Sequence, residues 1–597
     1  MGITKTGVTK KDKKEIIILI IILFLALSIR VINTNKTIVF DEFVQTNAVI
    51  NHNPAGLDDK TEIPPLTTWT RIAFVSIFGL STQSLKMVSV IFGILTILTV
   101  YFLAKELYDK KTAFISIILL GFSAWHILGS TSISFDGAFL TFYYVLTIFF
   151  FVKYSNTKRN QTLWLVLTGI SFGLAMLTKL NAILLLPILI IYYFLNNYYI
   201  LEYKDIEHKN SFQNNFYHKF IEAVKIFFII CLIALAIFSV FPISAYFTDW
   251  SYFQVVLSHT SVFSNNSFEI VLLLIQLMLS VFWAGPLFIG LYALSFLKFE
   301  KKDILLHLWI AVVFLFFILG VQENFRPFER YLLVILPALA ILGGKVIKDS
   351  INDLKLEKKH WSILGITLLL FTAIIFIFNL LHNRILPFYP KSGFISNALS
   401  FNWNFLVPLT GDQGPIGMYI SFNSIMFAFI FAAIFVIFYI ITYIKNAYLS
   451  SKKTKKNNNI KNFSRMFLIL FLSISFSYNV FIAQEMIWNL TNVNIDKVSK
   501  ETINYALEKD LEQPIIIFRN YALKYYLENK YQTINTADFN YENNQTLLSY
   551  INGTLLFIDF PAINQSSLLA KRLNRCNILQ KFIDKGITVG YIYSCPS

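Results

Sequence analysis

Charged residues are scarce in this chain, and long apolar runs take their place. Only 14% of the 597 residues are Asp, Glu, Lys or Arg, while 56% are hydrophobic. The apolar residues come in blocks of about seventeen or more, the length that spans the hydrocarbon core of a bilayer. The composition therefore excludes a soluble protein and predicts an integral membrane protein.

Histidine and cysteine are also rare, with eight and three residues. No His/Cys cluster has the spacing of a zinc site, which argues against a structural zinc. Cys576 and Cys595 suit a disulfide outside the cell, whereas Cys231 lies in an apolar run and suits packing. No small-x-small cleavage site follows the first apolar run, 16–29, so we expect an uncleaved span rather than a signal peptide.

Thirteen apolar segments are predicted to cross the membrane. Each must be helical, because a lone segment in lipid has to satisfy its own backbone hydrogen bonds. The predicted fold class is therefore an all-α polytopic membrane protein of about thirteen transmembrane helices. The segments are 15–32, 86–104, 113–129, 137–153, 162–178, 181–197, 224–247, 270–297, 304–320, 331–346, 362–381, 417–443 and 465–484.

Lysine and arginine are concentrated in alternate loops, and this bias sets the orientation. The basic N-terminus, 1–14, is predicted to be cytoplasmic, and an odd number of spans places the C-terminus outside the cell. The net charge of +16 then belongs largely to cytoplasmic loops, so it gives no reason to expect nucleic acid as a partner. The basic loop segments are 105–111, 153–159, 204–219, 298–302, 345–359 and 445–465.

After the last span, residues 485–597 mix polar and apolar positions. Strand-like and helix-like runs alternate there, which predicts a small extracytoplasmic α/β domain. The strand-like runs are 514–518, 554–558 and 587–593, and the helix-like runs are 498–509 and 521–530.

The remaining chain, 15–484, is predicted to form the membrane domain, in which two outer loops are unusually long, 33–85 and 382–416. Long loops with their own order tend to be functional. Within the first, residues 67–79 are predicted to form a helix along the interface, with Trp69 and Arg71 at head-group depth.

The first outer loop begins with two adjacent carboxylates, Asp41 and Glu42, and continues with Glu62-Ile63-Pro64-Pro65. This pattern resembles the polytopic glycosyltransferases that use polyprenyl-phosphate sugars, the protein O-mannosyltransferase and lipid A aminoarabinose transferase families with a GT-C fold. Further motifs follow in the family order over roughly residues 15–345. They are Ser84-to-Gly93, Tyr101-to-Asp109, Ser123-to-His126, Asp136-Gly137, Gly173-to-Lys179 and Arg330-Tyr331.

The resemblance implies an enzyme that displaces a lipid phosphate from the anomeric carbon of a sugar, with a lipid, glycan or protein as acceptor. It implies that Asp41 is the catalytic carboxylate, and that Glu42 raises the pKa of Asp41 or orients the acceptor. Glu62 occupies the place of an acid that contributes to a metal site in some relatives. A divalent metal there is the one cofactor that the resemblance suggests.

Two family cations are missing from this chain. Relatives often carry Lys or His where Ile63 stands, and an Arg shortly before the acid that corresponds to Asp136. A departing phosphate needs a cation, so we expect a substitute on the outer side. The candidates are Lys60, Lys179, His259, Arg326 and Arg330. His126 is instead expected to be a hydrogen-bonded core residue.

Three other classes remain open at this point. A transporter or flippase for a lipid-linked sugar would favour ionisable residues at mid-membrane, whereas here they gather at outer loop edges. An oligosaccharyltransferase would carry a Trp-Trp-Asp signature, which is absent. A catalytically degenerate scaffold with an outer binding domain would explain the missing cations.

Overall fold

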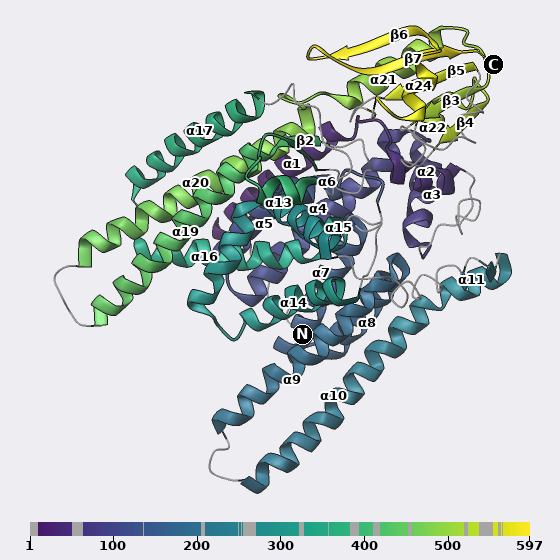
Figure 1. Cartoon of the computed structure of the whole chain (residues 1–597). Helices are drawn as coiled ribbons and strands as arrows, with labels where there is room; N and C mark the ends of the chain where they lie inside the picture. The colour runs from purple at the N-terminus through teal and green to yellow at the C-terminus, as the bar shows by residue number, and fades with distance from the viewer. Residues whose placement is uncertain are drawn as a thin grey trace.

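The structure is a computed structural model in which most of the chain is described. The described residues are 10–50, 64–134, 137–204, 209–248, 250–251, 253–254, 270–320, 328–355, 357–381, 393–409, 418–451, 457–518, 523–536, 553–558, 563 and 565–596. They form a large helical bundle with a small mixed domain at one end (Figure 1).

Each of the thirteen predicted spans overlaps at least one helix, and the predicted class, a polytopic helical membrane protein with a small C-terminal domain, is confirmed. Among the described residues, nine helices are long and apolar enough to cross a membrane, and three shorter apolar helices accompany them. The helices of the bundle are α1 (Lys10–Asn33), α2 (Phe40–Ile50), α3 (Leu66–Phe78), α4 (Thr82–Leu107), α5 (Lys110–Gly121), α6 (Ala124–Gly129), α7 (Ala138–Asn156), α8 (Gln161–Thr178), η2 (Leu180–Leu184), α9 (Leu185–Lys204), α10 (Lys209–Phe238), α11 (Val240–Thr248), α13 (Ile270–Ser295), η4 (Phe296–Lys298), α14 (Asp303–Gly320), α15 (Phe328–Tyr331), η5 (Leu332–Ile335), α16 (Leu336–Leu354), α17 (Lys358–Leu381), α18 (Gly393–Leu399), α19 (Phe422–Ser451) and α20 (Asn457–Trp488).

Several predicted spans differ in detail from the structure, and 224–247, for example, is divided between α10 and α11. The predicted helix 113–129 is interrupted at Phe122 and Ser123, where α5 ends and α6 has not begun. Asn479 satisfies the backbone at this break, since its amide donates to Phe122 O and accepts from Ala124 N–H. The predicted span 417–443 opens with a strand instead, β2 (Met418–Ser421), which pairs antiparallel with β1 (Leu406–Leu409).

Burial separates the central helices from the peripheral ones. In α4, α7, α13 and α20, 61–67% of the residues in each helix's apolar 18-residue window are buried. In α1, α17, α19 and the pair α10–α11 the share is only 11–28%. Peripheral helices expose large apolar side chains such as Phe228 and Leu369. This is expected of helices whose outer faces meet lipid rather than protein.

A polar cluster lies inside the bundle around Arg30, which is fully buried. Its guanidinium donates to Ser130 Oγ, to Gly121 O and to Ala26 O, and lies 2.7 Å from His126 Nδ1. His126 is therefore a hydrogen-bonded core residue, as predicted. The cluster ties α1 to the α5–α6 break.

Several predicted cytoplasmic segments meet at the end of the bundle away from the mixed domain. Glu15 of α1 pairs with Lys105 and Lys110, and Lys348 pairs with Asp109 at 3.1 Å. The segments 105–111 and 345–359 thus lie together with the N-terminal helix. That grouping agrees with the charge bias that placed them on one side of the membrane.

The mixed domain contains a five-stranded sheet in the order β4-β3-β5-β7-β6. Its predicted strands correspond to β3 (Ile515–Phe518), β5 (Gly553–Ile558) and β7 (Ile587–Cys595), and its predicted helices to α21 (Ile495–Glu508) and α22 (Leu523–Leu527). The sequence did not predict β4 (Thr533–Thr536), β6 (Asn577–Asp584) or α24 (Leu568–Leu573). The strands β4 and β6 are edge strands, and most side chains of β6 are exposed, so no buried apolar run marks it.

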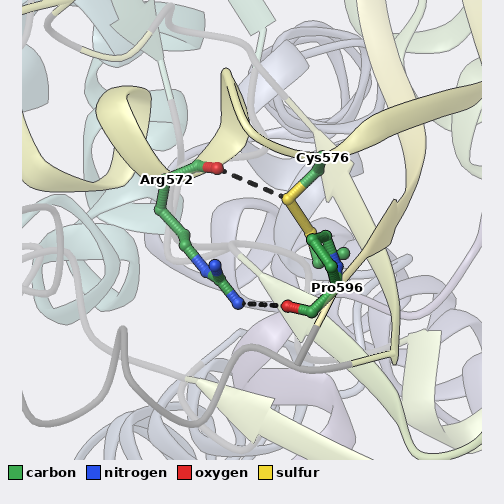
Figure 2. The surroundings of a disulfide bond; sticks show 4 residues. Arg572, Cys576 and Pro596 are labelled. Atoms are coloured by element: carbon green, nitrogen blue, oxygen red, sulfur yellow. Dashed lines mark hydrogen bonds between the residues drawn. A yellow bond between two sulfur atoms is a disulfide. The ribbon is translucent and has the colours of Figure 1, made fainter.

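A disulfide joins Cys576, just after α24, to Cys595 at the end of β7. Beside it, Arg572 of α24 donates to Pro596 O at 2.6 Å, which adds a second link to the chain end (Figure 2). The two contacts hold α24 against the sheet.

Helices α8 and α10 pack closely at Gly169 and Gly173, which lie one turn apart on α8. A β-carbon at Gly173 would lie 2.8 Å from Ala234 O and 2.7 Å from Ile237 Cβ, and one at Gly169 would lie 2.7 Å from Ile233 Cβ. Small residues spaced four apart allow helix backbones to approach in this way. Glycine is required here for packing.

We therefore predict that Gly173→Ala destabilises the protein by about 1–3 kcal/mol, the usual cost of overpacking. The measurement is the thermal unfolding midpoint of the detergent-solubilised protein. Gly365→Ala is the matched control, because a β-carbon there meets no atom within 4 Å. Equal midpoints for the two variants would show that α8 and α10 do not pack as described.

Candidate active site

The candidate site is built around the start of α2. The helix begins at Phe40, so Asp41 lies in its first turn and Glu42 is the third helical residue. The Glu42 carboxylate reaches back to accept from Val39 N–H at 3.1 Å, as a capping glutamate does. The structure places the backbone of Asp41, while its side chain lies outside what is described.

Glu42 is almost fully buried and has three partners. Its Oε1 accepts from Ile133 N–H at 2.9 Å, and its Oε2 lies 3.3 Å from Lys86 Nζ. Lys86, on α4, is equally buried and also donates to Lys36 O at 3.1 Å and Thr37 O at 3.3 Å. The Glu42–Lys86 ion pair therefore joins α2 to α4, and the hydrogen bond from Ile133 N–H joins Glu42 to the turn before α7.

Residues 35–39, which we call the strap, connect α1 to α2 and lie beside a cavity. The cavity has a volume of about 100 Å³ and its wall comes from both the bundle and the mixed domain. Its lining residues are Asn33, Lys36, Thr37, Val39, Glu42, Lys86, Leu128, Thr131, Ser132, Trp283, Leu409, Met418, Met486, Asn489, Ile495 and Asp496.

Lys36 supplies a cation to this cavity. Its ammonium donates to Met486 O at the end of α20. Burial lowers the pKa of Lys36 to about 8, although the nearby Asp496 carboxylate opposes this shift. Lys36 and Lys86 therefore place two ammonium groups in the wall of the cavity, and Lys86 is the one that pairs with Glu42.

Arg71 was predicted to lie at head-group depth, and the structure encloses its side chain in protein rather than exposing it on the outer face of α3. The side chain is fully buried, and its Nη2 donates to Ser89 Oγ and Ser134 O, each at 3.1 Å. Helix α3 exposes Ile77 and Phe78 instead. A helix is present where one was predicted, and Arg71 is on its inner face, where Ser89 Oγ on α4 and Ser134 O before α7 accept its hydrogen bonds.

Two of the predicted cations converge on one aromatic ring. Lys179 follows α8, and its Nζ lies 4.1 Å from the centroid of the Tyr331 ring. Arg330 Cζ lies 5.2 Å from the same centroid, and Arg330 Nη2 is 3.5 Å from Tyr331 Oη. Residues that are distant in the sequence are thus neighbours.

The Tyr331 cluster (Lys179, Arg330 and Tyr331) is close to the part of α6 that lines the cavity. Two residues beyond Tyr331, Leu333 lies so near Gly129 that a β-carbon there would meet Leu333 Cδ2 at 2.2 Å. Leu128, the neighbour of Gly129, lines the cavity. The segment that directly follows the Tyr331 cluster therefore packs against α6, next to Leu128 of the cavity wall.

Four predicted site residues, Lys60, Glu62, His259 and Arg326, lie outside the described residues. Among the residues that the structure describes, no group of three or more His, Cys, Asp or Glu side chains could hold a metal ion. The suggested metal role of Glu62 therefore stays a prediction, and no chemical step is assigned to a metal.

Part of the membrane domain is similar in sequence to known proteins. Residues 62–204 match the family model described as dolichyl-phosphate-mannose-protein mannosyltransferase. An uncharacterized protein of Aquifex aeolicus is 30% identical over 133 residues, which is 22% of this chain and 26% of that protein. This chain therefore matches about a quarter of the length of that relative.

Solved structures bear on the whole chain. The apo structure of ArnT from Cupriavidus metallidurans matches with a TM-score of 0.53 at 13% identity, covering 97% of this chain and 99% of ArnT. This chain has the ArnT fold. ArnT bound to undecaprenyl phosphate matches equally well, with a TM-score of 0.53, 13% identity and 98% coverage of each chain. The predicted resemblance to GT-C glycosyltransferases is confirmed at the level of the fold.

Sequence reasoning missed several residues of the site in this ArnT-like chain. Lys36, Lys86 and Asp496 all line the cavity, and Tyr331 organises the Lys179–Arg330 pair. Lys86 lies within a predicted span, where a lone lysine that must be buried needs a partner. That signal would have found Lys86, but nothing in the sequence relates Asp496 to the first outer loop.

We predict that Lys86→Met lowers stability by about 3–5 kcal/mol, because it leaves the buried Glu42 carboxylate without its counter-charge. The double variant Glu42→Gln/Lys86→Met should recover part of the loss, since a neutral amide still offers one acceptor oxygen. Thermal unfolding of the purified variants measures both effects.

Lys359→Met is the control for this pair, because the Lys359–Glu357 ion pair is exposed and should matter little. A double variant less stable than Lys86→Met alone would contradict the ion-pair argument.

Proposed function

We propose that this chain is an integral membrane glycosyltransferase that moves a sugar from a polyprenyl-phosphate donor to a lipid, glycan or protein acceptor. The observation that carries the proposal is the start of α2, where Glu42, the residue after Asp41, lines a cavity whose wall comes from both the bundle and the mixed domain. The match of residues 62–204 to a mannosyltransferase model and the fold shared with an undecaprenyl-phosphate-binding ArnT support it.

The proposed reaction is a displacement at the anomeric carbon. Asp41 accepts the proton of the acceptor hydroxyl as that oxygen forms a bond to the carbon. The bond from the carbon to the lipid phosphate breaks, and the phosphate leaves with the electron pair. General-base assistance of this kind is typically worth about 10²–10⁴ in rate.

Glu42 receives a different role from that of Asp41. Its carboxylate is engaged by Lys86 and by two backbone N–H groups, so little of it is left for an acceptor. We assign Glu42 the task of holding the first turn of α2, and thereby Asp41, against α4. This role replaces acceptor orientation in our proposal.

Lys179 and Arg330 are the proposed ligands of the donor phosphate. Both lie near the ring of Tyr331, so two positively charged groups are close to one another. Arginine can bind two phosphate oxygens with its planar fork, and lysine adds a point charge. This pair would replace the two cations that the family pattern lacks.

We further propose that the mixed domain, 485–597, lies outside the cell, and that transfer occurs on that face. The grouping of Glu15 with Lys105 and Lys110 at the opposite end supports this orientation, because basic loops remain cytoplasmic. The disulfide Cys576–Cys595 agrees with an oxidising compartment.

Asp41→Asn should lower turnover at least about a hundredfold, on the scale of lost general-base assistance. The assay is transfer from a radiolabelled polyprenyl-phosphate sugar in membranes, and the yield of folded protein should be unchanged. Asp510→Asn is the control, since Asp510 is fully exposed on the mixed domain. Retention of most activity by Asp41→Asn would remove Asp41 from the mechanism.

Arg330→Ala should weaken binding of undecaprenyl phosphate by roughly tenfold or more, because a hydrogen bond to a charged group is worth about 1.5–3 kcal/mol. Arg330→Lys should restore the affinity only in part, and Lys179→Ala should weaken it as well. Binding to the detergent-solubilised protein is measured by titration.

Arg159→Ala is the matched control for the phosphate ligands, because Arg159 is exposed in the turn before α8. If Arg330→Lys bound as tightly as the wild type, Arg330 would be an anchor for the helix end rather than a phosphate ligand. An affinity unchanged in Arg330→Ala would leave Lys179 as the candidate.

A further inference from the structure

Hydrogen bonds from the mixed domain hold the strap, the five residues that lead into α2. Asp496, in the first turn of α21, accepts from Thr37 N–H at 2.6 Å and from Thr37 Oγ at 2.8 Å. Lys500, one turn later, donates to Asn35 O at 2.7 Å. These contacts join segments more than 450 positions apart in the chain.

Tyr526 of α22 forms a hydrogen bond with the strap from a second helix of the mixed domain. Its hydroxyl accepts from Ile38 N–H at 2.9 Å and lies 3.3 Å from Thr82 Oγ at the start of α4. The ring also packs against the small apolar cluster formed around Ile38 and Phe43. The mixed domain therefore holds both the polar backbone and the apolar side of this region.

The bundle completes the set of strap contacts. Lys86 donates to the carbonyls of Lys36 and Thr37, and Glu42 accepts from Val39 N–H. Every residue from 35 to 39 thus has a backbone group bonded to a side chain, and three of these backbone groups are bonded to side chains of α21 and α22. Such a segment has few conformations left, and α2 starts directly after it.

Asp496 is itself firmly placed. At the helix start, Asn494 N–H donates to Asp584 Oδ2 at 2.8 Å, and Asp584 belongs to the hairpin between β6 and β7. Lys500 pairs with Asp496 Oδ2 at 2.9 Å. A carboxylate in the first turn of a helix is also favoured by the helix dipole.

We propose that Asp496 is a positioning residue for the transferase reaction: the mixed domain fixes the strap through Asp496 and thereby sets where Asp41 lies. This inference rests on the proposed function. The physical reason is that a displacement of about 1 Å at a catalytic group can cost 10²-fold in rate. The mixed domain is then part of the catalytic apparatus.

The test compares Asp496→Ala with Asp510→Ala in the full-length protein. Asp496→Ala should lower kcat at least tenfold in transfer from the radiolabelled polyprenyl-phosphate sugar. Its affinity for undecaprenyl phosphate should stay within twofold of the wild type, because the proposed phosphate ligands Lys179 and Arg330 are not among its contacts. Asp510→Ala should change neither quantity, since Asp510 is fully exposed and its contact with Lys530 is a long one of 3.8 Å.

Hydrogen exchange gives a readout that does not depend on turnover. The amides of the strap should exchange at least tenfold faster in Asp496→Ala than in the wild type. In Asp510→Ala they should exchange at the wild-type rate. Asp496→Asn keeps an acceptor oxygen for Thr37, so it should restore most of the protection and of kcat.

A milder variant, Thr37→Val, separates an effect on the strap from misfolding of the protein. Thr37→Val removes only the hydroxyl bond, so it should give a smaller loss of kcat, and it should add nothing in the Asp496→Ala background because the shared bond is already gone. Additive losses would overturn the proposal.

A wild-type kcat in folded Asp496→Ala would also overturn it, whether or not the strap exchanges faster. A wild-type protein that transfers no sugar from any polyprenyl-phosphate donor rejects the proposed function instead, and the positioning role falls with it.

Discussion

The ion pair between Glu42 and Lys86 is the interaction on which the rest of the site depends. Two charges buried to this extent are costly unless each is paired and its remaining lone pairs or protons are hydrogen-bonded. Here Glu42 accepts from two backbone N–H groups and Lys86 donates to two carbonyls, so both charges are satisfied. The same bonds order the strap, start α2 and connect it to α4.

The membrane imposes the surrounding architecture. Because lipid offers no hydrogen bonds, backbone that is not helical has to be satisfied by protein groups. The break between α5 and α6 meets this need through Arg30 and Asn479, and the strap meets it through Lys86 and the mixed domain. Non-helical backbone thus occurs where polar side chains are positioned to form hydrogen bonds with it. The cavity lies beside one such segment, the strap.

Much of the fold could be predicted from the sequence, because it depends on local signals. Spans follow from apolar length, and β3, β5 and β7 follow from apolar runs that end up buried. Arg71 shows where local reasoning fails. Its helix was predicted, but the acceptors at Ser89 and Ser134 that receive the Arg71 side chain lie in other segments, and no local pattern reveals them.

The sequence by itself determined that the protein lies in a membrane, because that needs only composition and the length of the apolar runs. Its motifs, taken in order, carried the resemblance to GT-C transferases, and that resemblance pointed to Asp41. Only the tertiary structure decided that Glu42 is paired with Lys86, that Lys179 and Arg330 share the ring of Tyr331, and that Asp496 grips the strap. Each of these contacts joins distant segments, and chain folding alone brings such side chains together.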